Sequence, residues 1–172
     1  TYPGGADAMP NPNATKTGYY LRKFLNENVN IQTGGGSDGH VVPLFRLAEI
    51  YLNYAEALNE YDPTNPDIAV YLNKIRERVS LPDVPSGLTQ EQMRTLLHHE
   101  RRVELAFEEH RFWDVRRGKV ASSTLGAPVK GVKITQDDAG NFTYSPVQVE
   151  QRVFQPKMYW YPIPQSELLK LK

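Results

Sequence analysis

The segment ERRVELAFEEHRFWDVRR, residues 100–117, constrains the fold most, because it combines ten charged side chains with many bulky apolar ones. At about 100° per residue in an α-helix, the apolar residues of this region fall into two stripes on roughly opposite sides. We therefore expect other elements to cover the helix on both sides. The first stripe holds Met93, Leu96, Leu97, Val103, Phe107 and Val115, and the second holds Leu105, Ala106, Phe112 and Trp113.

Several charges of this segment project from within the first stripe and are predicted to be partly buried. A buried charge persists where it is paired and hydrogen-bonded. Because Glu100, Glu104 and Glu108 follow one another at one-turn spacing and repel, their partners are expected from elsewhere in the fold. The predicted internal ion network comprises Glu100, Arg101, Glu104, Glu108, Arg111 and Asp114.

Arg111 is the predicted centre of this network, since Glu108 and Asp114 each lie three residues away from it. If Arg111 is buried there, Arg111→Ala should cost on the order of 3 to 5 kcal/mol, and lysine should rescue it only in part. Glu109→Ala, on a less constrained side, should change stability by well under about 1 kcal/mol. The alternative is that the charge run is a solvated surface.

Composition limits the possible partners. The chain has 172 residues with 40% hydrophobic content, which suits one domain or subdomain, and its 20 basic and 20 acidic residues cancel. This balance favours neither nucleic acid nor an anionic membrane as a partner. There is no cysteine and no apolar run long enough to cross a bilayer. The start at Thr1 leads us to expect the C-terminal fragment of a longer protein.

The remaining pattern predicts a mainly α fold with three regions. Residues 1–42 are expected to be irregular or extended, with a short strand or extended segment at 18–25 and a flexible glycine-rich loop at 34–39. Residues 43–118 are expected to be helical. Residues 119–172 are expected to form a two-stranded ribbon, VKGVKITQ and FTYSPVQVEQRVF joined by the turn DDAGN, followed by a short last helix near Gln165 or Ser166.

The helical region is expected to begin with an antiparallel helix pair of the tetratricopeptide type. The first helix starts at Pro43 and has an apolar face of Leu44, Leu47, Ala48, Tyr51, Ala55 and Leu58, with Glu49, Asn53, Glu56 and Glu60 opposite. The second is capped by Asn65 and has an apolar face of Ile68, Tyr71, Leu72, Ile75 and Val79. A long third helix is expected to run from Thr89 to about Arg117.

No catalytic, metal or cofactor site is predicted. The four histidines are His40, His98, His99 and His110, and HHERR lacks the second histidine of HExxH because Val103 occupies that position. Glu104 and Glu108 imitate a glycosidase pair, but such carboxylates face each other across a cleft. The loop at 34–39 lacks the residues of a phosphate-binding motif. For ligand binding, Trp160 is the one candidate, since its ring could stack on a sugar, although packing is the commoner fate of such a residue.

Four segments together resemble the C-terminal part of the SusD/RagB family: LFRLAEIYLNYAEALNE (44–60), LNKIRERV (72–79), ERRVELAFEEHRFWDVRRGK (100–119) and YWYPIPQSEL (159–168). The resemblance implies non-catalytic binding of oligosaccharides or other nutrients. It also implies a surface-exposed, lipid-anchored outer-membrane protein that caps a SusC-like TonB-dependent transporter. The lipidated cysteine is expected outside these residues.

The chain departs from the family pattern at some positions. Glu109 stands where the family often has glycine, Gly118 where tryptophan is common, and the QNPG-like ending is missing. Two alternatives to the binding protein stay open: a helical-repeat scaffold for a protein or peptide partner, and a glycoside hydrolase using Glu104 and Glu108. In both the family analogy and the residue pattern, the charged segment acts as an internal brace.

Overall fold

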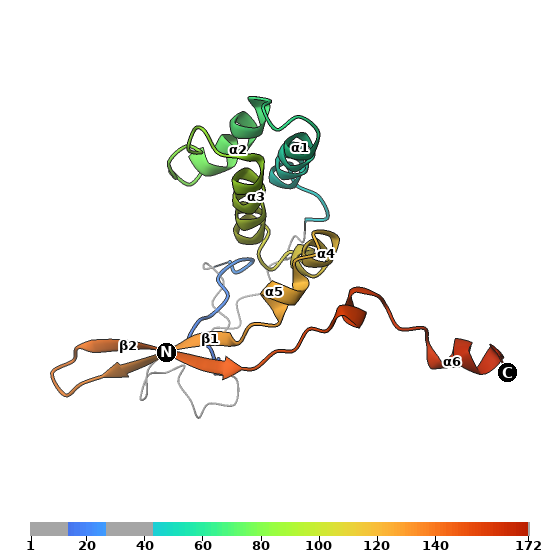
Figure 1. The fold of residues 1–172 in the computed structure, drawn as a ribbon. Helices are drawn as coiled ribbons and strands as arrows, with labels where there is room; N and C mark the ends of the chain where they lie inside the picture. The colour runs from blue at the N-terminus through green and yellow to red at the C-terminus, as the bar shows by residue number, and fades with distance from the viewer. Residues whose placement is uncertain (1–13, 27–42, 172) are drawn as a thin grey trace. The chain divides into compact units, whose positions relative to one another are not determined.

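The computed structural model describes residues 14–26 and 43–171 (Figure 1). The chain divides into two compact units, one made of residues 1–25 and 114–172 and the other of residues 26–113. Its described part is mainly helical with one small antiparallel sheet, so that the predicted fold class is confirmed. The glycine-rich loop predicted at 34–39 and His40 lie outside the described residues.

Three helices make up the core of residues 26–113: α1 (Leu47–Tyr61), α2 (Asp67–Glu77) and α3 (Gln90–Glu104). α1 contacts both α2 and α3, as Figure 1 shows. Each helix contributes apolar side chains at three- and four-residue spacing to one shared core. The buried members of this core are Leu52, Ala55, Ile68, Leu72, Ile75, Leu97 and Leu105.

Two ends of the helix pair differ from the prediction: α1 begins later in the chain, and α2 ends earlier. α1 starts at Leu47 rather than Pro43, because Arg46 keeps an extended backbone with φ −145° and ψ 155°. Before α2, Asn65 accepts a hydrogen bond from the Asp67 N–H at 3.1 Å, as a capping residue does. The predicted apolar face of α2 is wrong at its end, since α2 stops at Glu77 and Val79 is exposed.

The prediction of one long third helix is wrong, because the chain leaves the helical path between α3, which ends at Glu104, and α4 (His110–Arg117). α3 begins as expected, with Thr89 and Gln92 forming a capping box. At its other end the guanidinium of Arg46 donates to the Glu104 carbonyl oxygen at 2.6 Å, which satisfies a helix-end acceptor.

The break also overturns the two apolar stripes beyond Glu104. Phe107 and Glu109 have positive φ of 63° and 64°, in the left-handed region that no continuous α-helix contains. The residues after the break are therefore rotated away from the predicted faces. Phe107, Phe112 and Trp113 are exposed, whereas Leu105 and Val115 are buried. Val103, which lies before the break in α3, is exposed as well.

Glu109 is predicted to carry backbone strain that glycine would relieve. A non-glycine residue in the left-handed region costs about 1 to 2 kcal/mol, while glycine loses roughly 0.4 to 1 kcal/mol through its freer unfolded chain. Glu109→Gly should therefore stabilise the protein by about 0.5 kcal/mol. Chemical denaturation would measure this, with Glu109→Ala, which keeps the strain, as the control. A Glu109→Gly protein less stable than the alanine variant would contradict the interpretation.

The other unit contains α5 (Ala121–Leu125) and the predicted ribbon, which is confirmed as β1 (Val129–Gln136) paired antiparallel with β2 (Phe142–Glu150). The Asp137 side chain accepts from the Asn141 N–H at 2.8 Å, and Gly140 takes a positive φ of 86° in this turn. After β2 the chain runs through a 3₁₀ turn (Pro156–Tyr159) to α6 (Gln165–Leu168), which continues as a second 3₁₀ turn (Leu169–Leu171).

The N-terminal segment lies against β1 without forming a strand. Residues 18–25 contain a bend and a turn and no strand, so that, of the two forms expected there, a short strand is wrong and an extended segment is left. The Val132 N–H donates to the Thr17 carbonyl oxygen at 2.9 Å. This approach explains Gly131, because a Cβ there would lie 2.8 Å from the Thr17 Cα.

Among residues 14–26 and 43–171, no helix has both the length and the apolar character needed to span a membrane.

Candidate functional site

Arg46, which directly precedes α1, binds two acidic side chains: Glu104 at the end of α3, and Glu108 in the break that follows α3. Its Nε donates to Glu108 at 2.6 Å, and its Nη1 donates to Glu104. The carboxylates are largely buried, with 12% of the Glu104 side chain and 6% of the Glu108 side chain exposed. Burial alone would lower the pKa of Arg46, but the hydrogen bonds and charges of Glu108 and Glu104 raise it. This guanidinium therefore stays charged at any physiological pH.

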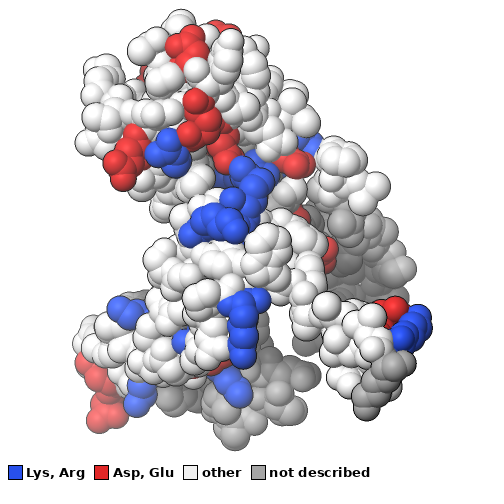
Figure 2. All heavy atoms as spheres, turned by 45° about the vertical axis from the view of Figure 1, so that its right-hand side comes forward, with Lys and Arg blue, Asp and Glu red and all other residues white. Residues whose placement is uncertain are grey.

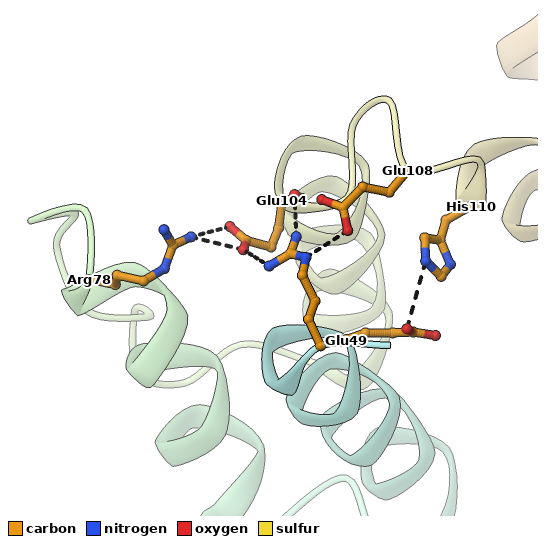
Figure 3. Close-up of polar contacts among 6 residues, drawn as sticks. Glu49, Arg78, Glu104, Glu108 and His110 are labelled. Carbon is orange, nitrogen blue, oxygen red and sulfur yellow. Dashed lines mark hydrogen bonds and ion pairs between the residues drawn. The ribbon is translucent and has the colours of Figure 1, made fainter. Parts of the chain in front are cut away.

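Two further arginines reach the same end of α3: Arg76 of α2, and Arg78, which directly follows α2. The Nη2 atom of Arg78 lies 2.8 and 2.7 Å from the two carboxylate oxygens of Glu104, as Figure 3 shows. Arg76 pairs with Glu100, which is only 7% exposed, and its Nε donates to the Pro82 carbonyl oxygen at 2.6 Å. Arginines from outside the segment thus neutralise the acids that the helix presents.

The polar face of α1 forms a ladder against α3 and α4. Its residues follow one another at four- and three-residue spacing, so they share one side of the helix. Four pairs make up the ladder: Glu60 with Arg94 at 2.7 Å, Glu56 with His98 at 3.8 Å, Asn53 with Arg101 at 2.6 Å, and Glu49 with His110 at 3.7 Å. Figure 2 shows acidic and basic side chains next to one another on the helical part of the chain. The polar side of α1 that carries these residues therefore faces α3 and the start of α4.

The contribution of the Glu60–Arg94 pair to the stability of the protein should depend on pH. The hydrogen bond from Arg94 lowers the pKa of Glu60 below its ordinary value of 4.5. The pair's contribution is then complete above that ordinary value and is lost as the pH falls through the lower, folded pKa. Because both side chains are partly exposed, the contribution should stay below about 1 kcal/mol.

Unfolding of the wild type and of Glu60→Gln at pH 7 and at pH 3 would measure this dependence. We expect a stability difference at pH 7 that shrinks at pH 3. An equal difference at both pH values would contradict an ionic role of Glu60.

Members of the predicted network lie in several different contacts. Glu104 and Glu108 meet at Arg46, whereas Glu100 and Arg101 each contact a different partner. Asp114 lies 3.5 Å from Arg117. Arg111 is half-buried in α4, and its importance for stability stays a prediction.

The sequence pattern does not predict which arginines bind these acids. Arg46 falls within the first turn of a helix predicted to start at Pro43, Arg76 lies off the apolar face of α2, and Arg78 follows α2. One sequence signal was available, since three uncompensated acids at one-turn spacing require cations from another segment.

The arrangement of these side chains does not resemble a catalytic or a metal site. Glu104 and Glu108 bind the same guanidinium, whereas glycosidase carboxylates face each other across a bound sugar. Within residues 14–26 and 43–171, no three His, Asp or Glu side chains gather closely enough to hold a metal ion.

In the other unit, Trp160 lies on a surface where cations and aromatic rings alternate. The Nζ of Lys119 lies 5.0 Å from the Tyr159 ring centre and 5.1 Å from that of Trp160. Tyr159 in turn packs edge-to-face against Phe154, and the contact with Ser122 lowers the pKa of its hydroxyl. Trp160 itself is 74% exposed, so one indole ring is available for an external partner. We call Lys119, Phe154, Tyr159 and Trp160 the cation–aromatic face.

Comparison with known protein families gives a match along the whole chain. The sequence model of the SusD family matches residues 1–172. SusD-like protein P2 of Formosa agariphila is 35% identical over 126 residues, which cover 69% of this chain and 24% of that protein. SusD-like protein P38 of the same organism is 36% identical over 125 residues, covering 68% of this chain and 24% of its own length. The chain thus spans about a quarter of the length of these curated relatives.

Solved structures give the same result. A SusD-like protein from Bacteroides fragilis superposes with a TM-score of 0.62 at 36% identity, over 72% of this chain and 23% of that one. A SusD-like carbohydrate binding protein from Bacteroides vulgatus superposes with a TM-score of 0.53 at 24% identity, over 74% of this chain and 28% of that one. The second likeness, at this identity, concerns the fold alone.

Proposed function

Because this chain belongs to the SusD family, we propose that it is part of a non-catalytic protein that binds oligosaccharides at the outer-membrane surface and delivers them to a SusC-like TonB-dependent transporter. The observation that carries the proposal is the family match over residues 1–172. A lipid anchor outside these residues would hold the protein at the membrane.

The chemistry of the described residues fits binding better than catalysis. The carboxylates nearest to one another are held by arginines, and the cation–aromatic face offers an exposed ring for a sugar. Trp160 is therefore the proposed ligand contact within this chain, and no cofactor is required.

Affinity purification of the protein from its own cells, followed by a panel of oligosaccharides, would test this function. We expect a TonB-dependent transporter to copurify and at least one oligosaccharide to bind and to be recovered intact. If no oligosaccharide bound and no transporter copurified, the proposed function would be wrong.

A second candidate, a helical scaffold for a protein or peptide, is favoured by one observation on α1. Exposed side chains recur on it at three- and four-residue spacing, which is the pattern of a helix-packing seam. They are Leu47, Ile50, Tyr54, Ala57 and Tyr61. Substituting Leu47 and Ile50 by Lys would abolish capture of a protein partner on this seam but leave oligosaccharide binding unchanged.

A further inference from the structure

The formal charge of zero hides a division between the two units. Residues 1–25 and 114–172 carry twelve Lys and Arg against six Asp and Glu, whereas residues 26–113 carry eight against fourteen. In the helical unit four of the acids, Glu60, Glu100, Glu104 and Glu108, pair with arginines at short range. The other unit therefore presents an excess of positive charge that the composition of the whole chain conceals.

This excess is concentrated in the two segments that form the cation–aromatic face. Residues 115–136 and 151–166 contain seven Lys and Arg and no Asp or Glu. Within the described residues of this unit, three carboxylates pair with other cations: Asp114 with Arg117, Glu150 with Arg152 and Glu167 with Lys170. The ammonium group of Lys119 instead lies over two aromatic rings, those of Tyr159 and Trp160.

The backbone at Lys119 has an unusual conformation. Lys119 follows the end of α4 with a φ of 56°, in the left-handed region where lysine is disfavoured. Tyr159 is fixed beside it, because its hydroxyl oxygen accepts from the Ser122 N–H at 3.2 Å. Arg116 extends the same chemistry one turn earlier, with its guanidinium carbon 5.6 Å from the centre of the Phe154 ring. The result is a cation beside an exposed indole.

We propose that the cation–aromatic face selects anionic oligosaccharides, whose sugar ring stacks on Trp160 while a carboxylate or sulfate group pairs with Lys119. A neutral sugar would use the indole but not the ammonium group. An anion without a sugar ring would use the ammonium group but not the indole. This inference rests on the proposed function, which it narrows to one class of ligand.

Titration calorimetry of the full-length protein would test the inference with three tetrasaccharides: a galacturonic acid oligomer, a sulfated oligomer and a neutral galactose oligomer. We expect at least one anionic oligomer to bind about tenfold more tightly than the neutral one, the gain that a charge-assisted contact gives. The difference should shrink as salt is added. Comparing the two anionic oligomers identifies whether carboxylate or sulfate is preferred.

Variants locate the site. Lys119→Gln should weaken anionic binding about tenfold and leave neutral binding unchanged, while Trp160→Ala should weaken both. Lys170→Gln is the matched control, because it removes the same charge from α6 and its 3₁₀ extension, where Lys170 pairs with Glu167 at 2.7 Å. Equal losses of affinity for the anionic oligomer in Lys119→Gln and Lys170→Gln would overturn the site, because the general positive charge of the unit would then explain the binding.

Two further outcomes separate this inference from the function on which it rests. Binding of the neutral oligomer as tightly as both anionic ones would overturn the inference and leave the proposed function standing. Failure of every oligosaccharide to bind would overturn both. Equally tight binding of single-stranded DNA that is also lost in Lys119→Gln would replace a glycan site by a general polyanion site and overturn the inference.

Discussion

Arg46→Ala is expected to destabilise the protein by about 3 kcal/mol, the cost of breaking a buried ion pair by removing one partner. The substitution takes the guanidinium away from two largely buried carboxylates, Glu104 and Glu108, and from the carbonyl oxygen that ends α3. Arg78 still contacts Glu104, which keeps the expected cost at the lower end of the range for such pairs. Urea denaturation followed by circular dichroism would measure the loss.

Two controls make this result specific. Arg46→Lys should recover only part of the loss, because an ammonium group cannot donate to two carboxylates and a carbonyl in a planar fork. Arg94→Ala, which breaks a partly exposed pair with Glu60, should cost less than about 1 kcal/mol. If Arg46→Ala and Arg94→Ala cost the same small amount, the network around Arg46 would not act as a brace.

Arg76→Ala is expected to cost a similar amount, about 3 kcal/mol, through a different pair. Glu100 is 7% exposed and takes its charge partner from Arg76 of α2. Removing that partner leaves a carboxylate in a site that excludes water, where an uncompensated charge is expensive. Thermal and urea unfolding of the single variant would report this loss.

The double variant Arg76→Met with Glu100→Leu separates the cost of an orphaned charge from the value of the pair. Apolar side chains of similar size often replace a buried ion pair with little loss of stability, so most of the deficit of Arg76→Ala should disappear. A double variant as unstable as Arg76→Ala would mean that the pair itself, or its bond to Pro82, supplies the stability.

Periodic patterns of apolar side chains predicted the elements whose contacts are local. α1, α2, the start of α3 at Thr89 and the ribbon with its turn all follow from residue spacing, capping residues and turn residues. The family itself could also be identified, because four segments keep their order along the chain.

The end of α3 could not be predicted from spacing, because its cause lies in another segment. The charged and apolar residues of 100–117 continue a helical period, but Arg46 binds the Glu104 carbonyl from 58 residues away. The glutamate at position 109, where the family often has glycine, was the local sign of the left-handed turn. The partners of the acids were missed for the same reason, since contacts across the fold leave no period in the sequence.

Titration of the full-length protein with oligosaccharides, followed by mass spectrometry of the recovered sugar, tests the central claim most directly. The proposed function predicts saturable binding with the sugar recovered at its original length, and weaker binding by Trp160→Ala. Shortened sugar whose release disappears in a folded Glu104→Gln or Glu108→Gln protein would show a hydrolase and contradict the claim, as would the absence of binding to any oligosaccharide.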